Sequence, residues 1–180
     1  MIYSFLQNGD SAVTVQFKNE ISEEVNRRVT GLCNRIEAKH INGIIELVPT
    51  FASLTVFYDC TIISSKKLKK KIKSLINGGE CDVKSTAKVW NIPVCYDDEF
   101  ALDMKNVCSH TALEREEVIK LHTSKPYLIY MLGFLPGFAY LGGMDERLFT
   151  PRLKTPRLEI FEGAVGIGGE QTGIYPIASP

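Results

Sequence analysis

Most of the glycine and proline in this 180-residue chain lies in its last third. Nine of the 14 glycines lie at or after Gly133, and six of the eight prolines lie at or after Pro126. Such a density interrupts helical periodicity and favours short strands joined by tightly shaped loops. Together with the apolar stretch from Tyr127 to Leu132, it predicts a β-barrel or β-sandwich in this part of the chain.

Residues 1–84 have a different pattern, which predicts a small α+β domain. Asn8-Gly9 separates two apolar runs, and both residues tolerate the positive φ of a hairpin turn. Ser22 precedes apolar residues at helical spacing and is placed to cap that helix. The expected elements are strands at 3–6 and 12–17, a helix at 22–36, strands at 44–48 and 54–58, and a lysine-rich helix that ends at Gly78-Gly79. This order predicts an antiparallel sheet with helices packed on one face.

Residues 85–180 are expected to form a second domain. Val89 to Val94 has the composition of a strand. Thr111-Ala-Leu-Glu114 has the form of a capping box, in which the hydroxyl and the carboxylate satisfy the first free amides of a helix that runs to about His122. The strand between Tyr127 and Leu132 follows, so the whole chain is predicted to be an α+β protein.

The composition argues against several classes of protein. Lys plus Arg number 21 and Asp plus Glu number 21, so no excess positive charge is available for nucleic acid. The lysines between Lys66 and Lys73 alternate with apolar residues at helical spacing, which is typical of a solvated helix face. The N-terminus lacks the pattern of a signal peptide, and no apolar stretch reaches the roughly 20 residues of a membrane helix.

The cysteines indicate a reducing compartment. The five of them form an odd set without a close pair: Cys33, Cys60, Cys81, Cys95 and Cys108. This spacing fits neither a zinc site nor a disulfide framework. We therefore expect free thiols, no metal site and a cytoplasmic protein.

A glycine-rich stretch from Gly163 to Gly169 raises the question of a nucleotide-binding loop. Its glycines do not have the Gly-x-Gly-x-x-Gly spacing, and neither Gly-Lys-Ser nor Gly-Lys-Thr follows. The segment after Glu170 does not begin an apolar helix. We expect no stand-alone nucleotide site here.

His122 is the histidine with the most interesting position. It closes the predicted helix directly before the apolar strand, and a histidine can both accept and donate a proton near neutral pH. A favourable interaction with the C-terminus of its own helix is the simpler explanation of its position. Both interpretations stay open at this point, whereas His40 and His110 are most simply solvated.

Aromatic residues and backbone-shaping residues alternate just after the predicted strand. Phe134, Pro136, Gly137 and Phe138 could form a corner of a barrel, or they could shape the wall of a small-molecule pocket in which Tyr140 offers its hydroxyl.

Two arginines follow in a near repeat of Thr-Pro-Arg-Leu. The guanidinium groups of Arg152 and Arg157 suit a carboxylate or phosphate, and surface ion pairs are the alternative.

The whole chain resembles a known family, that of the 5-oxoprolinase B subunits, also called allophanate hydrolase subunit 1. The similarity runs through residues 9–13, 48–50, 92–96, His122, 130–141, 155–157, 166–173 and Tyr175-Pro176. The resemblance implies a small N-terminal α+β sandwich domain followed by a cyclophilin-like β-barrel domain. Members of the family continue beyond the point that corresponds to Pro180, so we expect this barrel to be incomplete.

The resemblance also implies a function. It implies ATP-dependent opening of 5-oxo-L-proline to L-glutamate, together with companion subunits A and C, with ATP bound by the complex rather than evidently by this chain. The same family includes a non-enzymatic inhibitor of a sensor histidine kinase, and an allophanate- or urea-degrading hydrolase subunit is a third possibility. From residue chemistry we expect His122 to transfer protons. The expected substrate-binding residues are Tyr140, Arg152, Arg157, Gln171 and Thr172.

Overall fold

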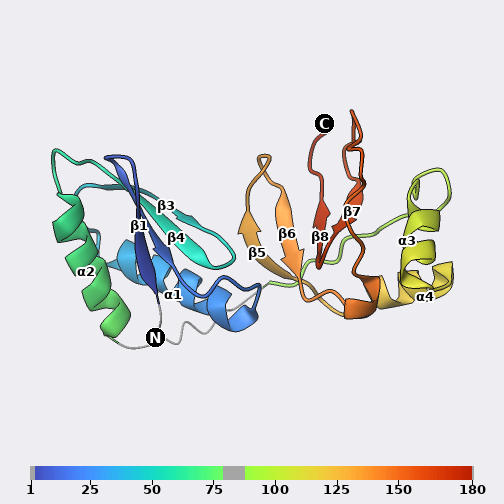
Figure 1. Cartoon of the computed structure of the whole chain (residues 1–180), viewed down its shortest axis with the longest axis horizontal. Coiled ribbons are helices and arrows are strands. Elements are labelled where there is room, and N and C mark those ends of the chain that lie inside the picture. Colours follow the sequence, from blue (N-terminus) through green and yellow to red (C-terminus); the bar gives the residue numbers. More distant parts are fainter. Residues whose placement is uncertain (1–2, 79–87, 180) are drawn as a thin grey trace. The chain divides into compact units, whose positions relative to one another are not determined.

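The computed structural model describes residues 3–78 and 88–179, drawn as ribbons in Figure 1. The chain divides into two compact units, Met1–Thr86 and Ala87–Pro180. Within the described residues, each unit has one four-stranded antiparallel sheet and two α-helices. The α+β class expected from the sequence is therefore confirmed.

The sheet of the first unit has the strand order β1-β2-β4-β3. Its strands are β1 (Ser4–Asn8), β2 (Ala12–Gln16), β3 (Ile44–Pro49) and β4 (Ser53–Tyr58), and its helices are α1 (Glu23–Ala38) and α2 (Ser65–Asn77). The predicted hairpin forms at Gly9, whose φ of +61° glycine adopts without strain. Ser22 caps α1 as expected, since its side chain accepts a hydrogen bond from the backbone N–H of Val25 at 3.2 Å.

Alternate residues of β2 and β4 form the buried face of this sheet. Val13 lies opposite Val56, Val15 lies opposite Leu54, and all four are fully buried. Apolar residues of both helices join the same core: Val29, Leu32 and Ile36 from α1, and Leu68, Ile72 and Ile76 from α2. Both helices therefore cover one face of the sheet, and most lysines of α2 remain exposed as predicted.

The second unit begins with helices and ends with a sheet of strand order β5-β6-β8-β7. Its elements are α3 (Met104–Thr111), α4 (Arg115–His122), β5 (Leu128–Leu132), β6 (Ala139–Gly142), the short 3-10 helix η1 (Glu146–Leu148), β7 (Val165–Gly168) and β8 (Gln171–Ile174). Val118 and Leu121 of α4 pack against Met144 and Leu148 in the core of this unit. The strand expected after Tyr127 is thus confirmed as β5.

Two expectations for the second unit are wrong. The described residues of Val89 to Val94 form no strand, although Val89, Trp90 and Ile92 are apolar and exposed. A strand is stabilised by its pairing partners as much as by its composition, and this segment pairs with none of the described strands.

The capping box is the second wrong expectation. Thr111 belongs to α3, where its hydroxyl donates to the carbonyl of Val107 at 2.8 Å. Ala112 then ends that helix with a left-handed φ of +57°. Glu114 is the N-cap residue of α4 and makes no capping bond with its side chain. A separate helix, α3, was therefore hidden in the segment before the predicted one.

The closed cyclophilin-like barrel is not confirmed. In the part of the chain that the structure describes, β5 and β7 are the outer strands of an open sheet, and closure would require these outer strands to be linked by hydrogen bonds. The same residues contain no helix of the length and apolarity that a bilayer requires.

Candidate functional site

His122 is the last residue of α4 and is only 8% exposed. Its Nδ1 atom lies 2.6 Å from the hydroxyl of Tyr96, and its Nε2 atom lies 3.1 Å from the hydroxyl of Thr172 on β8. The carbonyl of His122 accepts a further bond from the hydroxyl of Tyr127 at 2.7 Å. The imidazole therefore links the end of a helix to the sheet and to the phenol of Tyr96, and the backbone of the same residue binds the phenol of Tyr127.

The surrounding bonds fix the protons on this imidazole. Thr172 donates its own hydroxyl proton to the carbonyl of Gly166 at 3.0 Å, so it must accept the proton of His122 Nε2. Nδ1 is then the acceptor for the hydroxyl of Tyr96. Burial lowers the pKa of His122 and raises the pKa of Tyr96, and it raises the pKa of Tyr127 to about 12. All three groups are therefore neutral at pH 7.

This burial predicts a pH dependence of stability in the second unit. The pKa of His122 in the folded chain lies below the ordinary value of about 6.5, so the unfolded chain binds more protons between the two values. The contribution of the neutral imidazole to the free energy of unfolding is complete above about pH 6.5. It is lost as the pH falls through the folded pKa, by at most about 1.4 kcal/mol per pH unit. Amide exchange of β5 to β8 between pH 5 and 8 should show this slope.

The matched variants are His122→Gln and His110→Gln, because His110 is exposed. The first should abolish the slope between pH 5 and 7, and the second should leave it. An unchanged slope in His122→Gln would assign the pH dependence to other groups.

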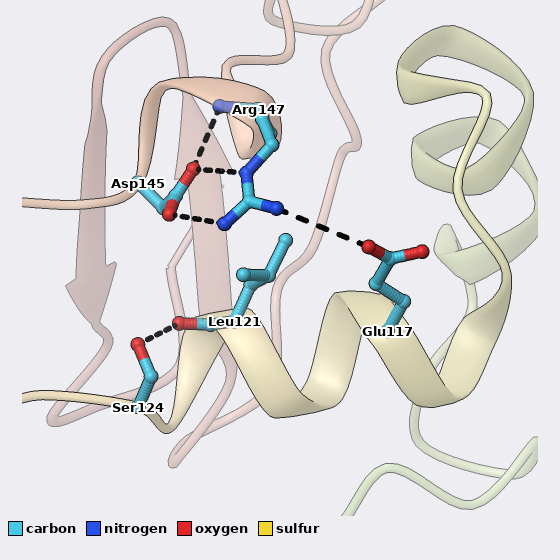
Figure 2. A network of polar contacts seen from close by, with 5 residues as sticks. All are labelled: Glu117, Leu121, Ser124, Asp145 and Arg147. Atoms are coloured by element: carbon cyan, nitrogen blue, oxygen red, sulfur yellow. Dashed lines mark hydrogen bonds and ion pairs between the residues drawn. The ribbon is translucent and has the colours of Figure 1, made fainter.

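A network of polar contacts fastens η1 to α4, as Figure 2 shows. Asp145 accepts bonds from the guanidinium of Arg147 at 2.9 Å and from its backbone N–H at 3.0 Å. These bonds lower the pKa of Asp145 to about 2. Arg147 also reaches Glu117 of α4 at 4.0 Å, and the hydroxyl of Ser124 donates to the carbonyl of Leu121 at 2.8 Å. The contact between Arg147 and Glu117 thereby joins the segment after β6 to the helix that carries His122.

Glycine residues line the face of the second unit's sheet that is opposite to His122. Successive residues of a strand point to opposite faces, so Gln171 and Gly173 point away from the side on which Thr172 meets His122. Pairing places Gly168 beside Gln171, and Gly166 and Tyr140 beside Gly173. These side-chain positions therefore share one face, which we call the glycine-floored face.

Aromatic rings and one guanidinium cover these glycines. A Cβ atom added to Gly173 would lie 2.7 Å from the ring of Phe138, and one added to Gly166 would lie 3.6 Å from the ring of Tyr175. One added to Gly168 would lie 3.4 Å from the side chain of Arg152. The glycine-floored face consists of Phe138, Tyr140, Arg152, Gly166, Gly168, Gln171, Gly173 and Tyr175.

Two polar side chains on this face, Arg152 and Gln171, have unused donors. Among the described residues, Arg152 is in no ion pair, and the buried Nε2 atom of Gln171 has no hydrogen-bond partner. Arg157 differs, because its Nη2 atom lies 2.5 Å from Asp103. The structure thus separates the two arginines that the sequence presented as equivalent.

The loop between β5 and β6 carries the remaining predicted residues. Phe134 has a left-handed φ of +63°, which is uncommon for a residue other than glycine, and Gly137 has a φ of +84°. The ring of Phe134 meets those of Phe138 and Tyr175 edge-on, with centroids 5.6 and 6.2 Å apart. Pro136 is exposed within this loop. The turn therefore directs Phe134 onto the rings of the glycine-floored face.

The predicted residues fall into three groups. His122 and Thr172 lie together on one side of the sheet, whereas Phe134, Phe138, Tyr140, Arg152 and Gln171 gather at the glycine-floored face. Arg157 pairs with Asp103 at the start of α3.

Two residues with clear contacts in these groups were not expected, Tyr96 and Tyr175. Both lie in the segments that carry the family resemblance, 92–96 and Tyr175-Pro176, so the resemblance could have pointed to them.

Two hollows in the surface of the described residues lie outside these groups. One of about 260 Å³ is lined by α1 and β3 of the first unit, and one of about 410 Å³ lies between α4 and Arg147. Neither is lined by a predicted site residue. The described residues contain no cluster of three or more ligands suited to a metal ion.

Comparison with known proteins identifies the family. Residues 3–180 match the family described as "Carboxyltransferase domain, subdomain C and D". The B subunit of the 5-oxoprolinase of Bacillus subtilis is 42% identical over 189 aligned residues, which cover 99% of this chain and 78% of the relative.

Solved structures show the same fold. The crystal structure of TTHA0988 has a TM-score of 0.80 and 34% identity, and the match covers 94% of this chain but only 33% of that one. The urea amidolyase of Kluyveromyces lactis has a TM-score of 0.78 at 20% identity, over 97% of this chain and 12% of the enzyme, which shows a shared fold alone. The chain belongs to the carboxyltransferase subdomain C and D family and, within it, to the 5-oxoprolinase B subunits.

Proposed function

We propose that this chain is the B subunit of a cytoplasmic, ATP-dependent 5-oxoprolinase, which opens 5-oxo-L-proline to L-glutamate together with companion subunits A and C. The observation that carries the proposal is the 42% identity to the B subunit of a 5-oxoprolinase across 99% of the chain. The four cysteines that the structure describes are unpaired, which suits a reducing compartment.

The chemistry of the reaction explains why several subunits share it. A lactam is stabilised by resonance, so hydrolysis needs an activated carbonyl oxygen, stabilisation of the developing charge and a deprotonated water. The substrate carboxylate must also be held in place. The glycines of residues 163–169 belong largely to β7 and the turn after it rather than to a loop before a helix. We therefore assign ATP to the assembled complex and substrate binding in part to this chain.

His122 keeps the proposed role in proton transfer. Its partner Tyr96 is half-buried, whereas His122 is buried, so the phenol is the more accessible end of the pair. A proton would pass between the phenol and Nδ1, while Thr172 orients the ring. Thr172 is then a positioning residue rather than one that touches the substrate.

Turnover by the reassembled complex tests the proposed function. This chain alone is expected to produce no glutamate from 5-oxo-L-proline, and the protein assembled with ATP and both companion subunits is expected to produce it. The same assembly without ATP is the control. Robust ATP-dependent turnover by this chain alone would contradict the division of labour.

Co-purification distinguishes the alternatives. Recovery of companion subunits with the protein would support the proposed enzyme, whereas recovery of a histidine kinase alone would overturn it in favour of an inhibitor. Turnover of allophanate or urea in place of 5-oxo-L-proline would identify the third possibility. The likeness to urea amidolyase does not favour it, because that likeness concerns the fold.

A further inference from the structure

We infer that the glycine-floored face is a binding site for a small carboxylate, in which Arg152 pairs with the carboxylate and Gln171 donates a hydrogen bond to one of its oxygens. This inference rests on the proposed function for the identity of the ligand, a five-membered lactam that carries a carboxylate. It names the part of the chain that holds the lactam and the groups that recognise it.

The first argument is that the two donors converge. Gln171 and Gly168 are directly opposite each other on β8 and β7, and side chains at such positions point to the same face a few ångströms apart. The side chain of Arg152 lies beside the position that a Cβ atom of Gly168 would take, with its Nε atom 3.4 Å from that position. The bridge between Thr150 and Gly169 holds the segment before Arg152 next to the end of β7.

The second argument is that both donors lack a partner. The Nε2 atom of Gln171 is buried without an acceptor among the described residues, and such groups are rare because burial removes their bonds to water. Arg152 is in none of the ion pairs of those residues, whereas Arg157 in the neighbouring Thr-Pro-Arg segment pairs with Asp103. A carboxylate supplies acceptors for both groups, and a guanidinium binds it in a bidentate manner.

The third argument concerns the apolar part of the ligand. Phe138 contacts Tyr140 and Tyr175 edge-on, with ring centroids 4.9 and 5.0 Å apart. The ring of Phe138 lies so close to Gly173 that a Cβ atom there would displace it, and the ring of Tyr175 lies in van der Waals reach of Gly166. A flat five-membered ring can lie against such aromatic surfaces while its carboxylate extends toward Gln171 and Arg152.

The test measures, by calorimetry and without ATP, ligand binding to the protein assembled with its companion subunits. The probes are 5-oxo-L-proline and 2-pyrrolidinone, which has the same ring but no carboxylate. Arg152→Gln should weaken binding of 5-oxo-L-proline at least 10-fold and leave binding of 2-pyrrolidinone unchanged. Gln171→Glu should also weaken it, because a second carboxylate repels the first. Arg157→Gln is the matched control and should bind both probes as the unsubstituted protein does.

Several results would overturn the inference. These are unchanged binding in Arg152→Gln, an equal loss in Arg157→Gln, and a failure of the unsubstituted complex to prefer 5-oxo-L-proline over 2-pyrrolidinone. Turnover measured in parallel separates this site from the proposed function. Normal turnover with an unchanged KM in Arg152→Gln would contradict the proposed carboxylate site and leave the proposed function standing. Carboxylate-dependent binding without any turnover of 5-oxo-L-proline would support the proposed site and contradict the proposed function.

Discussion

Substituting Gly142 by Ala is expected to destabilise the second unit by about 1–3 kcal/mol or more, the usual cost of overpacking a core. A Cβ atom at this position would lie 2.0 Å from Cε2 and 2.6 Å from Cδ2 of Tyr130. Gly142 is buried in β6, and Tyr130 on the neighbouring β5 is only 7% exposed. The ring has little room to move aside, because it is itself buried and packed interiors have little free volume.

Amide exchange of the separate units provides the measurement. Protection of β5 and β6 should fall in Gly142→Ala, while protection of β2 and β4 should stay the same, because the two units have separate cores. The control is Gly31→Ala in α1, where an added Cβ atom meets nothing within 4 Å. That variant should stabilise the first unit by roughly 0.5–1 kcal/mol, since alanine favours a helix over glycine. Undiminished protection of β5 in Gly142→Ala would show that Tyr130 has room to move.

Substituting His122 by Gln in the assembled complex is expected to lower turnover by about 10²-fold or more, the usual scale for general acid–base catalysis. Glutamine keeps a donor for the hydroxyl of Thr172 but cannot carry a proton at neutral pH. Tyr96→Phe is the companion variant, because it keeps the ring and removes only the hydroxyl that bonds Nδ1. A path for the proton through Tyr96 requires a comparable loss in both variants.

A purely structural role for His122 gives a different result. In that case Tyr96→Phe would lose one buried hydrogen bond, worth about 1 kcal/mol of stability, and turnover would not change. Normal turnover by a correctly assembled His122→Gln complex would remove His122 from the chemistry. His110→Gln serves as the control for assembly and for total histidine content, because His110 is exposed.

The elements of the first unit could be predicted because their signals are local. Asn8-Gly9 marks the hairpin, Ser22 marks the start of α1, and each buried face follows its own periodicity. The second unit was harder to predict. Val89 to Val94 has the composition of a strand but pairs with none of the described strands. The hydroxyl of Thr111 bonds within the helix before it and does not cap the one after it.

The site was predictable in its residue types but not in its geometry. Gln171 and Thr172 are adjacent in the sequence and were expected to serve one ligand, yet the pleat of β8 sends them to opposite faces. Arg152 and Arg157 share a motif, and only the ion pair with Asp103 tells them apart. Such distinctions depend on strand pairing and on distant partners, neither of which a single sequence displays.

The bond between His122 and Thr172 also helps to fix the register of β7 and β8, which the two strands specify poorly by themselves. Three of the eight residues in β7 and β8 are glycine, and strands of this kind slip easily because few side chains distinguish one face from the other. A slip of β8 by one residue would turn Thr172 toward the aromatic rings and leave the buried imidazole opposite a residue without a hydroxyl. The observed alignment gives Nε2 its acceptor on Thr172, so a histidine buried on one side of the sheet helps to determine which residues the sheet presents on the other side.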